Sequence, residues 1–398
     1  MFLQFLRQYN PRLINCAADF LKKGLIQPDS YVLDLDAIET NADRILRSAR
    51  EHGVSLYFMS KQIGRNPLVS RRVLSRRIAD EPLGSFAGMV AVDYREALSL
   101  HNAGLTVSHV GHLVQIPDRL IDPVLDMRPQ VITVYSLEKA RTLGGQARAK
   151  GLVQPVLLRI CDEGNSTYPG QEGGFSPHEA VEAAAAINLI EGLRFAGITS
   201  FPCFLQEKTG GKAAPTPNAY TLVQTEALIR KCLNLRCVQI NMPSCTSPET
   251  IPQIAGMGGT HGEPGHSLTG TNPDNIQSRD PLIPGLVYVT EVSHHYRGFS
   301  SCYGGGHYRR SHIREALIGS DDSYETAEVL PPTAEAIDYH FSLPGIFPIG
   351  MPVLMSFRTQ IFVTRSCVVP VEGISAGMPR ITGIWDSQGR RLSPGEIR

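Results

Sequence analysis

The sequence predicts an α/β protein, a (β/α)8 barrel of the TIM type followed by a smaller C-terminal β-domain. Two observations lead to this fold class. Between about residues 30 and 270, short apolar runs alternate with segments whose apolar residues recur every three or four positions, the pattern of repeated strand–helix units. Beyond about residue 275, apolar and polar residues alternate between glycine- and proline-rich turns, and no long helix follows.

Apolar runs in the first part of the chain are predicted to form strands. In chain order they are Tyr31–Asp36, Leu56–Ser60, Met89–Asp93, Val107–His112, Val131–Ser136, Val156–Cys161, Phe195–Phe201, Val238–Met242 and a short run near His266–Leu268. Strands joined by helices pair in parallel through right-handed crossovers. The repeated units after the opening run indicate a closed barrel, in which functional residues gather at the carboxyl ends of the strands. The residues predicted to surround that mouth are Lys61, Asp93, His112, Arg159, Phe201 and Ser244.

Helical spacing of apolar residues marks the segments between these runs. The clearest helical segments are Asp36–His52, Tyr94–Ala103, Leu137–Lys150, Pro177–Ile190 and Asn218–Leu233. The first of them offers Asp36 or Thr40 as a cap residue.

Turn-forming residues after residue 271 indicate a linker, and two alternating segments beyond it, Leu286–His294 and Val353–Val371, are predicted to be β-structure. We therefore expect a helical segment over residues 1–29, the barrel over residues 30–272 and the β-domain over residues 280–398.

Composition excludes some functions. The 38 basic and 38 acidic residues give a formal net charge of zero, so there is no basis for predicting binding to nucleic acid or to a membrane surface. No run reaches transmembrane length, and the first residues lack the apolar core and cleavage site of a signal peptide. The eight cysteines are scattered, which suits reduced thiols better than a disulfide framework. We expect a cytoplasmic protein.

Lys61 ends an apolar run that is predicted to be a buried strand, and the chain turns after it at Gly64 and Pro67. A lysine held against apolar surface loses the hydration of its ammonium group, which favours the neutral amine. A neutral amine at the end of a rigid strand is suited to form a Schiff base with a carbonyl cofactor such as pyridoxal phosphate. Most lysines at strand ends are solvated instead, so this interpretation depends on the rest of the chain.

The order of the motifs resembles the alanine-racemase-like, fold-type III pyridoxal phosphate enzymes, and most closely their YhfX-type group of predicted racemases. Leu33–Asn41 is similar to the family's opening strand and first-helix cap, Lys61 occupies the position of its Schiff-base lysine, and Ala91–Ala97 is similar to its second strand and helix. The resemblance covers about residues 30 to 310. It implies pyridoxal 5'-phosphate as cofactor, an amino acid or amine as substrate, and a homodimer with shared active sites.

Ser244 and Thr246 follow a predicted strand and precede a predicted helix. Their hydroxyls and the backbone amides beside them would suit a phosphate dianion, and the position after the penultimate barrel strand is a common phosphate site. An ordinary helix cap explains the same residues equally well. The resemblance further implies that Gly265 and its neighbour His266 cradle the phosphate of the cofactor.

Glu263 lies in the glycine-rich segment Gly258–His266, at the position that faces the pyridine nitrogen of the cofactor in the family that the chain resembles. Alanine-type racemases have an arginine there, whereas the related amino-acid decarboxylases have a glutamate. A carboxylate beside the ring nitrogen keeps it protonated and makes the ring a strong electron sink. A surface loop with an exposed acid is the alternative.

Two further residues are assigned to the cofactor by the resemblance. Phe201 matches a position where the family stacks a histidine on the cofactor ring, and an aromatic face would stack there as well, although a strand-end phenylalanine is often simple core. Arg159 replaces a family lysine near the phenolate oxygen, where a cation would keep that oxygen ionised.

A racemase that uses two acid/base groups needs a second one opposite the lysine, and in the family it comes from the β-domain of a partner subunit. Tyr303 is similar to the family's catalytic tyrosine, and Cys302 to the cysteine that protonates the carbanion in the decarboxylases. Either could transfer a proton if the cofactor and nearby His307 or Arg309 lowered its pKa. Both remain candidates.

The same region is rich in residues that can bind zinc, namely His294, His295, Cys302, His307 and His312. Their spacing matches no compact ligand motif, so we predict no metal site.

These residues together predict a pyridoxal phosphate-dependent amino-acid racemase or epimerase, in which Lys61 holds the cofactor and takes the α-proton from an external aldimine. The first alternative is an amino-acid decarboxylase, favoured by Glu263 and Cys302. The others are a pyridoxal phosphate-binding protein without turnover and a metal-dependent barrel lyase.

Overall fold

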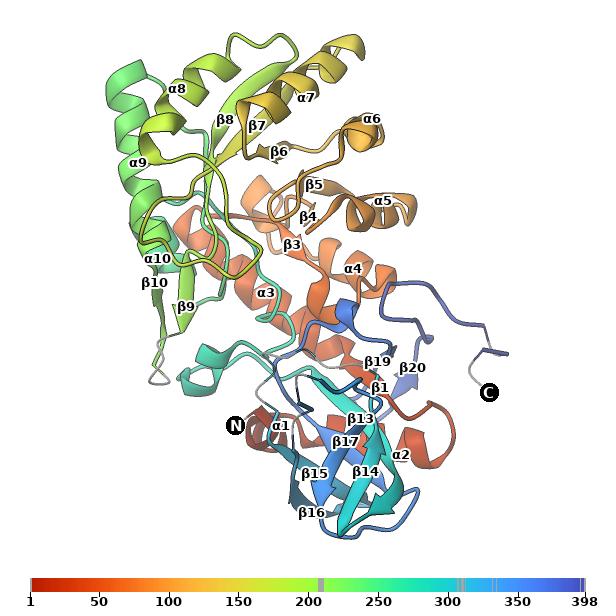
Figure 1. Ribbon diagram of the computed structural model, residues 1–398. Coiled ribbons are helices and arrows are strands. Elements are labelled where there is room, and N and C mark those ends of the chain that lie inside the picture. Colours follow the sequence, from red (N-terminus) through yellow and green to blue (C-terminus); the bar gives the residue numbers. More distant parts are fainter. Residues whose placement is uncertain are drawn as a thin grey trace. The chain divides into compact units, whose positions relative to one another are not determined.

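The computed structural model describes residues 2–206, 211–305, 308, 311, 313–330, 332–333, 335–393 and 395–396. The chain divides into two units (Figure 1). The barrel unit contains Asp43–Met59 and Leu74–Gly265, and the β-unit contains Met1–Ala42, Ser60–Val73 and His266–Arg398. Two helices, α3 (Leu35–His52) and α4 (Pro67–Leu74), carry residues of both units.

Parallel strands form a closed sheet in the barrel unit, in the order β2-β12-β11-β8-β7-β6-β5-β4-β3. Their bounds are β2 Ser55–Leu56, β3 Phe58–Met59, β4 Met89–Val90, β5 Val107–Val110, β6 Val131–Val134, β7 Gln154–Arg159, β8 Leu193–Thr199, β11 Gln239–Asn241 and β12 His261–Gly262. Strands β2 and β3 are separated by Tyr57 alone, yet β2 pairs with β12 and β3 pairs with β4. The sheet therefore closes at Tyr57, which confirms the predicted barrel.

Helices follow the barrel strands along the chain (Figure 1). They are η2 Pro82–Gly84, α5 Tyr94–Asn102, η3 Asp118–Leu120, α6 Ile121–Asp126, α7 Leu137–Ala149, α8 Pro177–Ile187, α9 Pro217–Leu233 and α10 Ile251–Gly256, with a hairpin of β9 Phe204–Gln206 and β10 Ala213–Pro215 after β8. Side-chain caps set several starts: Asp93 accepts the amide of Glu96, and Ser136 accepts the amide of Lys139.

The last barrel strand differs from its predicted position near His266–Leu268. Strand β12 is His261–Gly262, where His261 pairs with Asn241 and with Ser55, and residues 266–270 form turns. A Cβ on Gly262 would lie 2.8 Å from the methyl carbon of Thr246, so β12 approaches the segment that follows β11 closely enough to need glycine. The glycines that suggested a loop therefore belong in part to a strand.

The β-unit is built on a second sheet, in the order β16-β15-β18-β13-β1-β19-β20, with β14 pairing with β13 and β17. The strands are β1 Ser30–Asp34, β13 Leu286–Tyr296, β14 Phe299–Tyr303, β15 Glu315–Ser320, β16 Ser323–Glu328, β17 His340–Pro344, β18 Pro352–Met355, β19 Cys367–Glu372 and β20 Arg380–Ile381. The short helices of this unit are η1 Lys61–Ile63, η4 Pro273–Gln277 and η5 Ile361–Val363. The alternating segment Val353–Val371 is thus two strands with η5 between them.

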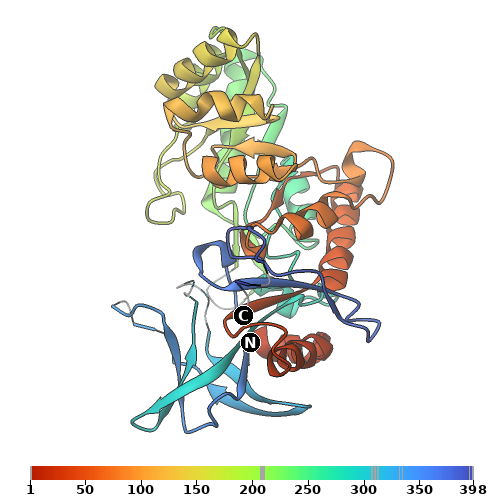
Figure 2. The same ribbon diagram turned by 90° about the vertical axis from the view of Figure 1, so that its right-hand side faces the viewer.

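The opening strand belongs to the β-unit and not to the barrel. Strand β1 pairs antiparallel with β13 and parallel with β19, so residues 30–34 are hydrogen-bonded on both sides to C-terminal strands. Helices α1 (Phe2–Tyr9) and α2 (Pro11–Lys22), red in Figure 2, pack beside the blue and teal strands of this unit, where Leu13 and Ala17 share a core with Val287. This division differs from the expected boundaries at residues 29 and 280, because the pairing partners of β1 are distant in the sequence.

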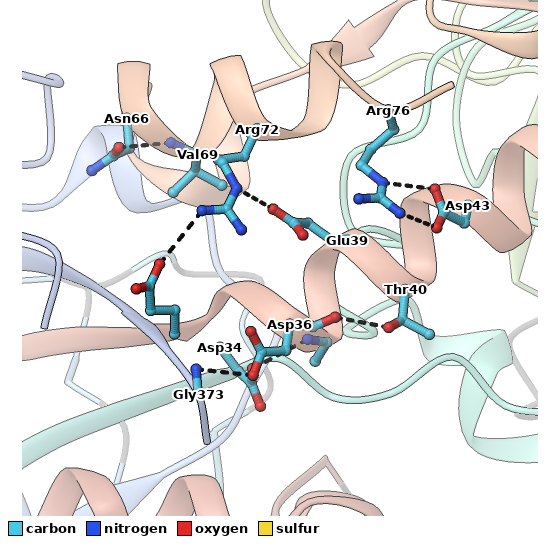
Figure 3. A network of polar contacts seen from close by, with 12 residues as sticks. Asp34, Asp36, Glu39, Thr40, Asp43, Asn66, Val69, Arg72, Arg76 and Gly373 are labelled. Atoms are coloured by element: carbon cyan, nitrogen blue, oxygen red, sulfur yellow. Dashed lines mark hydrogen bonds and ion pairs between the residues drawn. The ribbon is translucent and has the colours of Figure 1, made fainter. Parts of the chain in front are cut away.

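Polar contacts at the start of α3 correct the predicted cap (Figure 3). Oδ1 of Asp34 accepts the amide of Ala37 at 3.1 Å, because the helix begins at Leu35. Asp36 instead accepts the amide of Gly373 at 3.0 Å, and the hydroxyl of Thr40 donates to the carbonyl of Asp36.

Among the described residues, no helix has both the length and the apolar character needed to cross a membrane.

Candidate active site

A buried cluster surrounds Glu263 in the barrel unit. Oε1 of Glu263 accepts hydrogen bonds from Nδ1 of His109 at 3.1 Å and from Nδ2 of Asn241 at 2.8 Å. Nε2 of His112 lies 3.9 Å from Oε2 of Glu263. The Glu263 side chain is 4% exposed, so this residue is not the exposed acid of a surface loop.

Strand geometry brings these side chains together. His109 lies in β5, Asn241 ends β11 and Glu263 follows β12 directly, so residues far apart in the sequence meet inside one parallel barrel. The backbone of Glu263 is held as well, because its amide donates to Oγ1 of Thr246 at 2.9 Å. Thr246 therefore positions Glu263.

Burial by itself would raise the pKa of Glu263, but neighbouring groups outweigh it. The charge of His112, the hydrogen bond and charge of His109 and the amide of Asn241 lower this pKa from 4.5 to about 2. Burial lowers the pKa of nearby His261 to about 4 and raises that of Tyr57. Glu263 is therefore an ionised carboxylate at neutral pH, and His109 and His112 are the contacting groups that can carry a positive charge.

The depressed pKa of Glu263 gives a testable pH dependence of stability. A carboxyl whose folded pKa lies below its unfolded value contributes stability above the unfolded pKa and loses it as the pH falls. The free energy of unfolding of the wild-type protein should therefore fall more steeply than that of Glu263→Gln between about pH 5 and about pH 3. Denaturant unfolding at several pH values measures both curves, and parallel curves would contradict the prediction.

Two imidazoles and a carboxylate are also a donor set of the kind that binds Zn²⁺. One ligand atom from each of His109, His112 and Glu263 lies within 4.8 Å of the others. The same side chains are linked to one another without an ion, and Nε2 of His109 lies 2.7 Å from Oγ1 of Thr133.

Arg159 presents buried hydrogen-bond donors at the end of β7. Its side chain is almost fully buried, Nη2 donates to the carbonyl of Phe201 at 3.1 Å, and Cζ lies 5.7 Å from the ring centre of Tyr135. Within the described residues, Nε and Nη1 of Arg159 have no hydrogen-bond partner. Open donors on a buried guanidinium are costly unless a ligand accepts them, and they fit an anionic oxygen such as the phenolate of pyridoxal phosphate.

Phe201 presents its ring to the same part of the barrel. The ring centres of Phe201 and His112 are 5.7 Å apart in an edge-to-face arrangement, and Tyr168 lies 5.9 Å from Phe201 on a tilted plane. Phe201 therefore contacts two other predicted mouth residues, His112 through its ring and Arg159 through its carbonyl.

The predicted phosphate segment has an unusual backbone. Ser244 and Cys245 have φ values of 91° and 51°, a region that residues other than glycine enter rarely and often at functional sites. Helix α10 begins only at Ile251, so neither Ser244 nor Thr246 is its cap, which removes the alternative interpretation. The hydroxyl of Ser244 donates to the carbonyl of Phe204 at 2.7 Å. Gly265, further along the chain, is buried.

Lys61 lies two residues beyond β3 and opens η1, and its side chain is buried, as the sequence suggested. The turn ends at Gly64, where the φ of 62° favours glycine. A Cβ added at Gly64 would also lie 2.8 Å from a methyl carbon of Val368, so the position has no room for a larger residue. The short helix therefore fixes the backbone that carries the amine.

His266 and Arg358 contact each other in the β-unit. Nε of Arg358 donates to Nε2 of His266 at 3.3 Å, and Nδ1 of His266 lies 3.2 Å from Oγ1 of Thr271. The sequence alone assigned no role to Arg358, which lies between β18 and η5 in a segment that is neither helix nor strand.

The two candidates for the second acid/base differ in exposure. Tyr303 is 41% exposed and lines an open pocket of about 650 Å³ in the β-unit, together with Glu291, His340 and Arg365. Cys302 is fully buried, and burial raises the pKa of its thiol to about 12. Its Sγ lies 3.8 Å from the carbonyl of Phe341.

The histidine-rich region is described only in part, because His307, Arg309 and His312 lie outside the described residues. Over the described part of the chain, His294, His295 and Cys302 do not belong to a group with the spacing of a metal site.

Sequence reasoning missed His109 and Asn241. His109 is visible as a polar residue in the strand Val107–Val110, between valines that predict burial, but its partner Glu263 is 154 residues away. Asn241 is recognisable from the sequence only as the end of a strand.

Family models match most of the chain. The alanine racemase N-terminal domain matches residues 33–273, and the YhfX-like C-terminal domain matches residues 287–381. A full-length relative, the protein YhfX of Escherichia coli (strain K12), is 43% identical over 394 residues, which cover 98% of this chain and 100% of that protein.

Solved structures share the fold at low identity. A D-threonine aldolase from Filomicrobium marinum has a TM-score of 0.67 at 19% identity, covering 91% of this chain and 95% of the other. An alanine racemase from Clostridium difficile 630 has a TM-score of 0.64 at 15% identity, covering 90% and 98%. A D-threo-3-hydroxyaspartate dehydratase from Delftia sp. HT23 has a TM-score of 0.64 at 16% identity, covering 89% and 96%.

Proposed function

Because the chain belongs to the family of the alanine racemase N-terminal domain and carries a YhfX-like C-terminal domain, we propose that it is a pyridoxal phosphate-dependent amino-acid racemase or epimerase. The observation that carries the cofactor chemistry of the proposal is the buried, ionised Glu263, held by His109 and Asn241. An anion in this place suits the protonated ring nitrogen of the cofactor.

The residues that the resemblance assigns to pyridoxal phosphate have the charges, donors and acceptors that suit this cofactor. Lys61 would bind it covalently, Glu263 would accept a hydrogen bond from its ring nitrogen, and the open donors of Arg159 suit its phenolate oxygen. Ser244 and Gly265 of the barrel unit would hold its phosphate, with Phe201 against its ring. The resemblance adds His266, the next residue along the chain after Gly265.

The bound cofactor supplies an electron sink that stabilises negative charge at the substrate α-carbon. Lys61 would take the α-proton on one face, because its buried amine is attached to a rigid backbone. Tyr303, contributed by a second copy of the chain, would return a proton on the other face. Its exposure supports this choice over Cys302, whose thiol is buried and hard to ionise.

A decarboxylase is the second candidate function, and Glu263 is the observation that favours it. A protonated ring nitrogen stabilises the carbanion left by carbon dioxide as well as the one left by a proton. A carrier without turnover has no need of the pocket that contains Tyr303.

Incubation with single amino acids in deuterated water tests the proposal. A racemase or epimerase should place deuterium on the α-carbon and invert the configuration, which chiral chromatography with mass spectrometry measures. An amine product would support the decarboxylase instead. Exchange with none of the amino acids, in protein that contains the cofactor, would favour the carrier.

Replacing Tyr303 with phenylalanine should lower turnover by about 10²- to 10⁴-fold, the usual loss for an acid/base group, and leave cofactor content unchanged. The matched control is Cys302→Ala, which removes a neighbouring buried thiol and should keep turnover within a few-fold of wild type. Steady-state kinetics and cofactor absorbance measure both effects. The opposite ranking of the two variants would assign the role to Cys302.

A further inference from the structure

We propose that His109 and His112 are positioning residues that fix the Glu263 carboxylate for the ring nitrogen of bound pyridoxal phosphate. This inference rests on the proposed function, because it concerns the partner of Glu263 in the loaded protein. It assigns roles to two histidines that lie next to the two carboxylate oxygens of Glu263.

His109 fixes the direction of the carboxylate. One ring nitrogen of His109 contacts Oε1 of Glu263 at 3.1 Å and the other lies 2.7 Å from Oγ1 of Thr133, so the imidazole bridges β6 and the residue after β12. Its ring packs 5.6 Å from Tyr57 and 5.3 Å from His112. With both nitrogens engaged and its faces packed, His109 has little freedom to release Glu263.

His112 lies beside the other carboxylate oxygen. Its Nε2 is 3.9 Å from Oε2, too far for a good hydrogen bond, and its charge is the largest of the effects that lower the pKa of Glu263. Phe201 meets the His112 ring edge to face at 5.7 Å, which limits access of water to this side. A carboxylate buried without such a counter-charge would take up a proton.

Three other titratable groups that interact with Glu263 are neutral and cannot supply this charge. His261 and Tyr57 stack on each other at 5.3 Å, and both are held neutral by burial, as is the thiol of Cys203. Asn241 donates to Oε1 but carries no charge. A neutral Glu263 would not keep the ring nitrogen protonated, so the histidines determine whether the cofactor acts as a strong electron sink.

The test compares two cofactors in cofactor-free protein: pyridoxal phosphate and its 1-deaza analogue, in which a C–H group replaces the ring nitrogen. Binding is followed by absorbance and by quenching of protein fluorescence. Wild-type protein should prefer pyridoxal phosphate by roughly 10- to 100-fold, the range expected for a hydrogen bond to a charged group. His109→Leu and His112→Gln should each reduce that ratio by about tenfold, because they remove a bond and a charge respectively.

Conservative variants separate positioning from folding. His109→Asn places an amide N–H near the position of Nδ1 and should restore most of the preference. The matched control is His261→Asn, which changes a half-buried histidine. Its Nδ1 contacts Oγ1 of Thr260 at 2.8 Å rather than the carboxylate, so the ratio should stay at the wild-type value. Circular dichroism and thermal unfolding confirm that each variant is folded.

Three results would overturn the inference. The first is an unchanged ratio in both His109→Leu and His112→Gln. The second is one equivalent of a divalent metal in purified wild-type protein that is lost in His112→Gln, because the cluster would then be a metal site. The third is wild-type protein that binds neither cofactor. That result would overturn the proposed function together with this inference. It differs from the first result because no cofactor is bound at all.

Discussion

Replacing Lys61 with alanine is expected to abolish covalent attachment of pyridoxal phosphate and to lower turnover by at least about a thousandfold. The expectation follows from the buried position of Lys61 on a short helix immediately after a barrel strand. Borohydride reduction followed by peptide mass spectrometry locates the attachment, and racemisation kinetics measure turnover.

The control for this prediction is Lys231→Ala, which removes an exposed lysine from α9 and should change neither quantity. A reduced adduct that persists in Lys61→Ala would show that another amine holds the cofactor. Loss of folding is checked by circular dichroism, because a buried side chain is being removed.

Replacing Glu263 with glutamine should lower turnover by about 10²- to 10³-fold while Lys61 stays attached to the cofactor, a loss typical of removing a preorganised electrostatic group. Glutamine keeps the volume of the side chain and one acceptor oxygen but removes the charge that His109 and His112 contact. The electron sink should therefore weaken without loss of binding. Single-turnover kinetics separate this effect from substrate affinity.

The matched control is Glu138→Gln, which changes an exposed residue at the start of α7 whose ion-pair partner, Arg141, is exposed as well. Turnover of that variant should equal wild type. If Glu263→Gln were fully active, the carboxylate would have a structural role only, and the argument for a strongly protonated ring would fail.

The sequence predicted the features that depend on local patterns. Strand–helix alternation indicated the barrel, and the apolar run before Lys61 indicated a buried lysine after a strand. Glu263 was identified through the resemblance, and its burial agrees with the role that the resemblance implies. The barrel and the buried lysine were predictable because each depends on residues close together in the chain.

Features that depend on distant residues were not predicted. In the sequence, His109 is a polar residue within a strand, and nothing near it in the chain indicates its partner. That partner, Glu263, lies 154 residues later. The cap of α3 is Asp34 and not the predicted Asp36, because the helix starts earlier than its periodicity indicates. Strand β1 was expected in the barrel but pairs with β13 and β19, which lie near the other end of the chain.

Strand β1 has a consequence for the order in which the chain can fold. It is an inner strand whose two neighbours, β13 and β19, are synthesised only after the whole barrel segment, so the second sheet has a high contact order and must form late. The barrel segment, by contrast, pairs each strand mostly with its neighbours in sequence and can form during synthesis. A fragment that starts at residue 280 would lack an inner strand and would expose unpaired edges of β13 and β19 to aggregation.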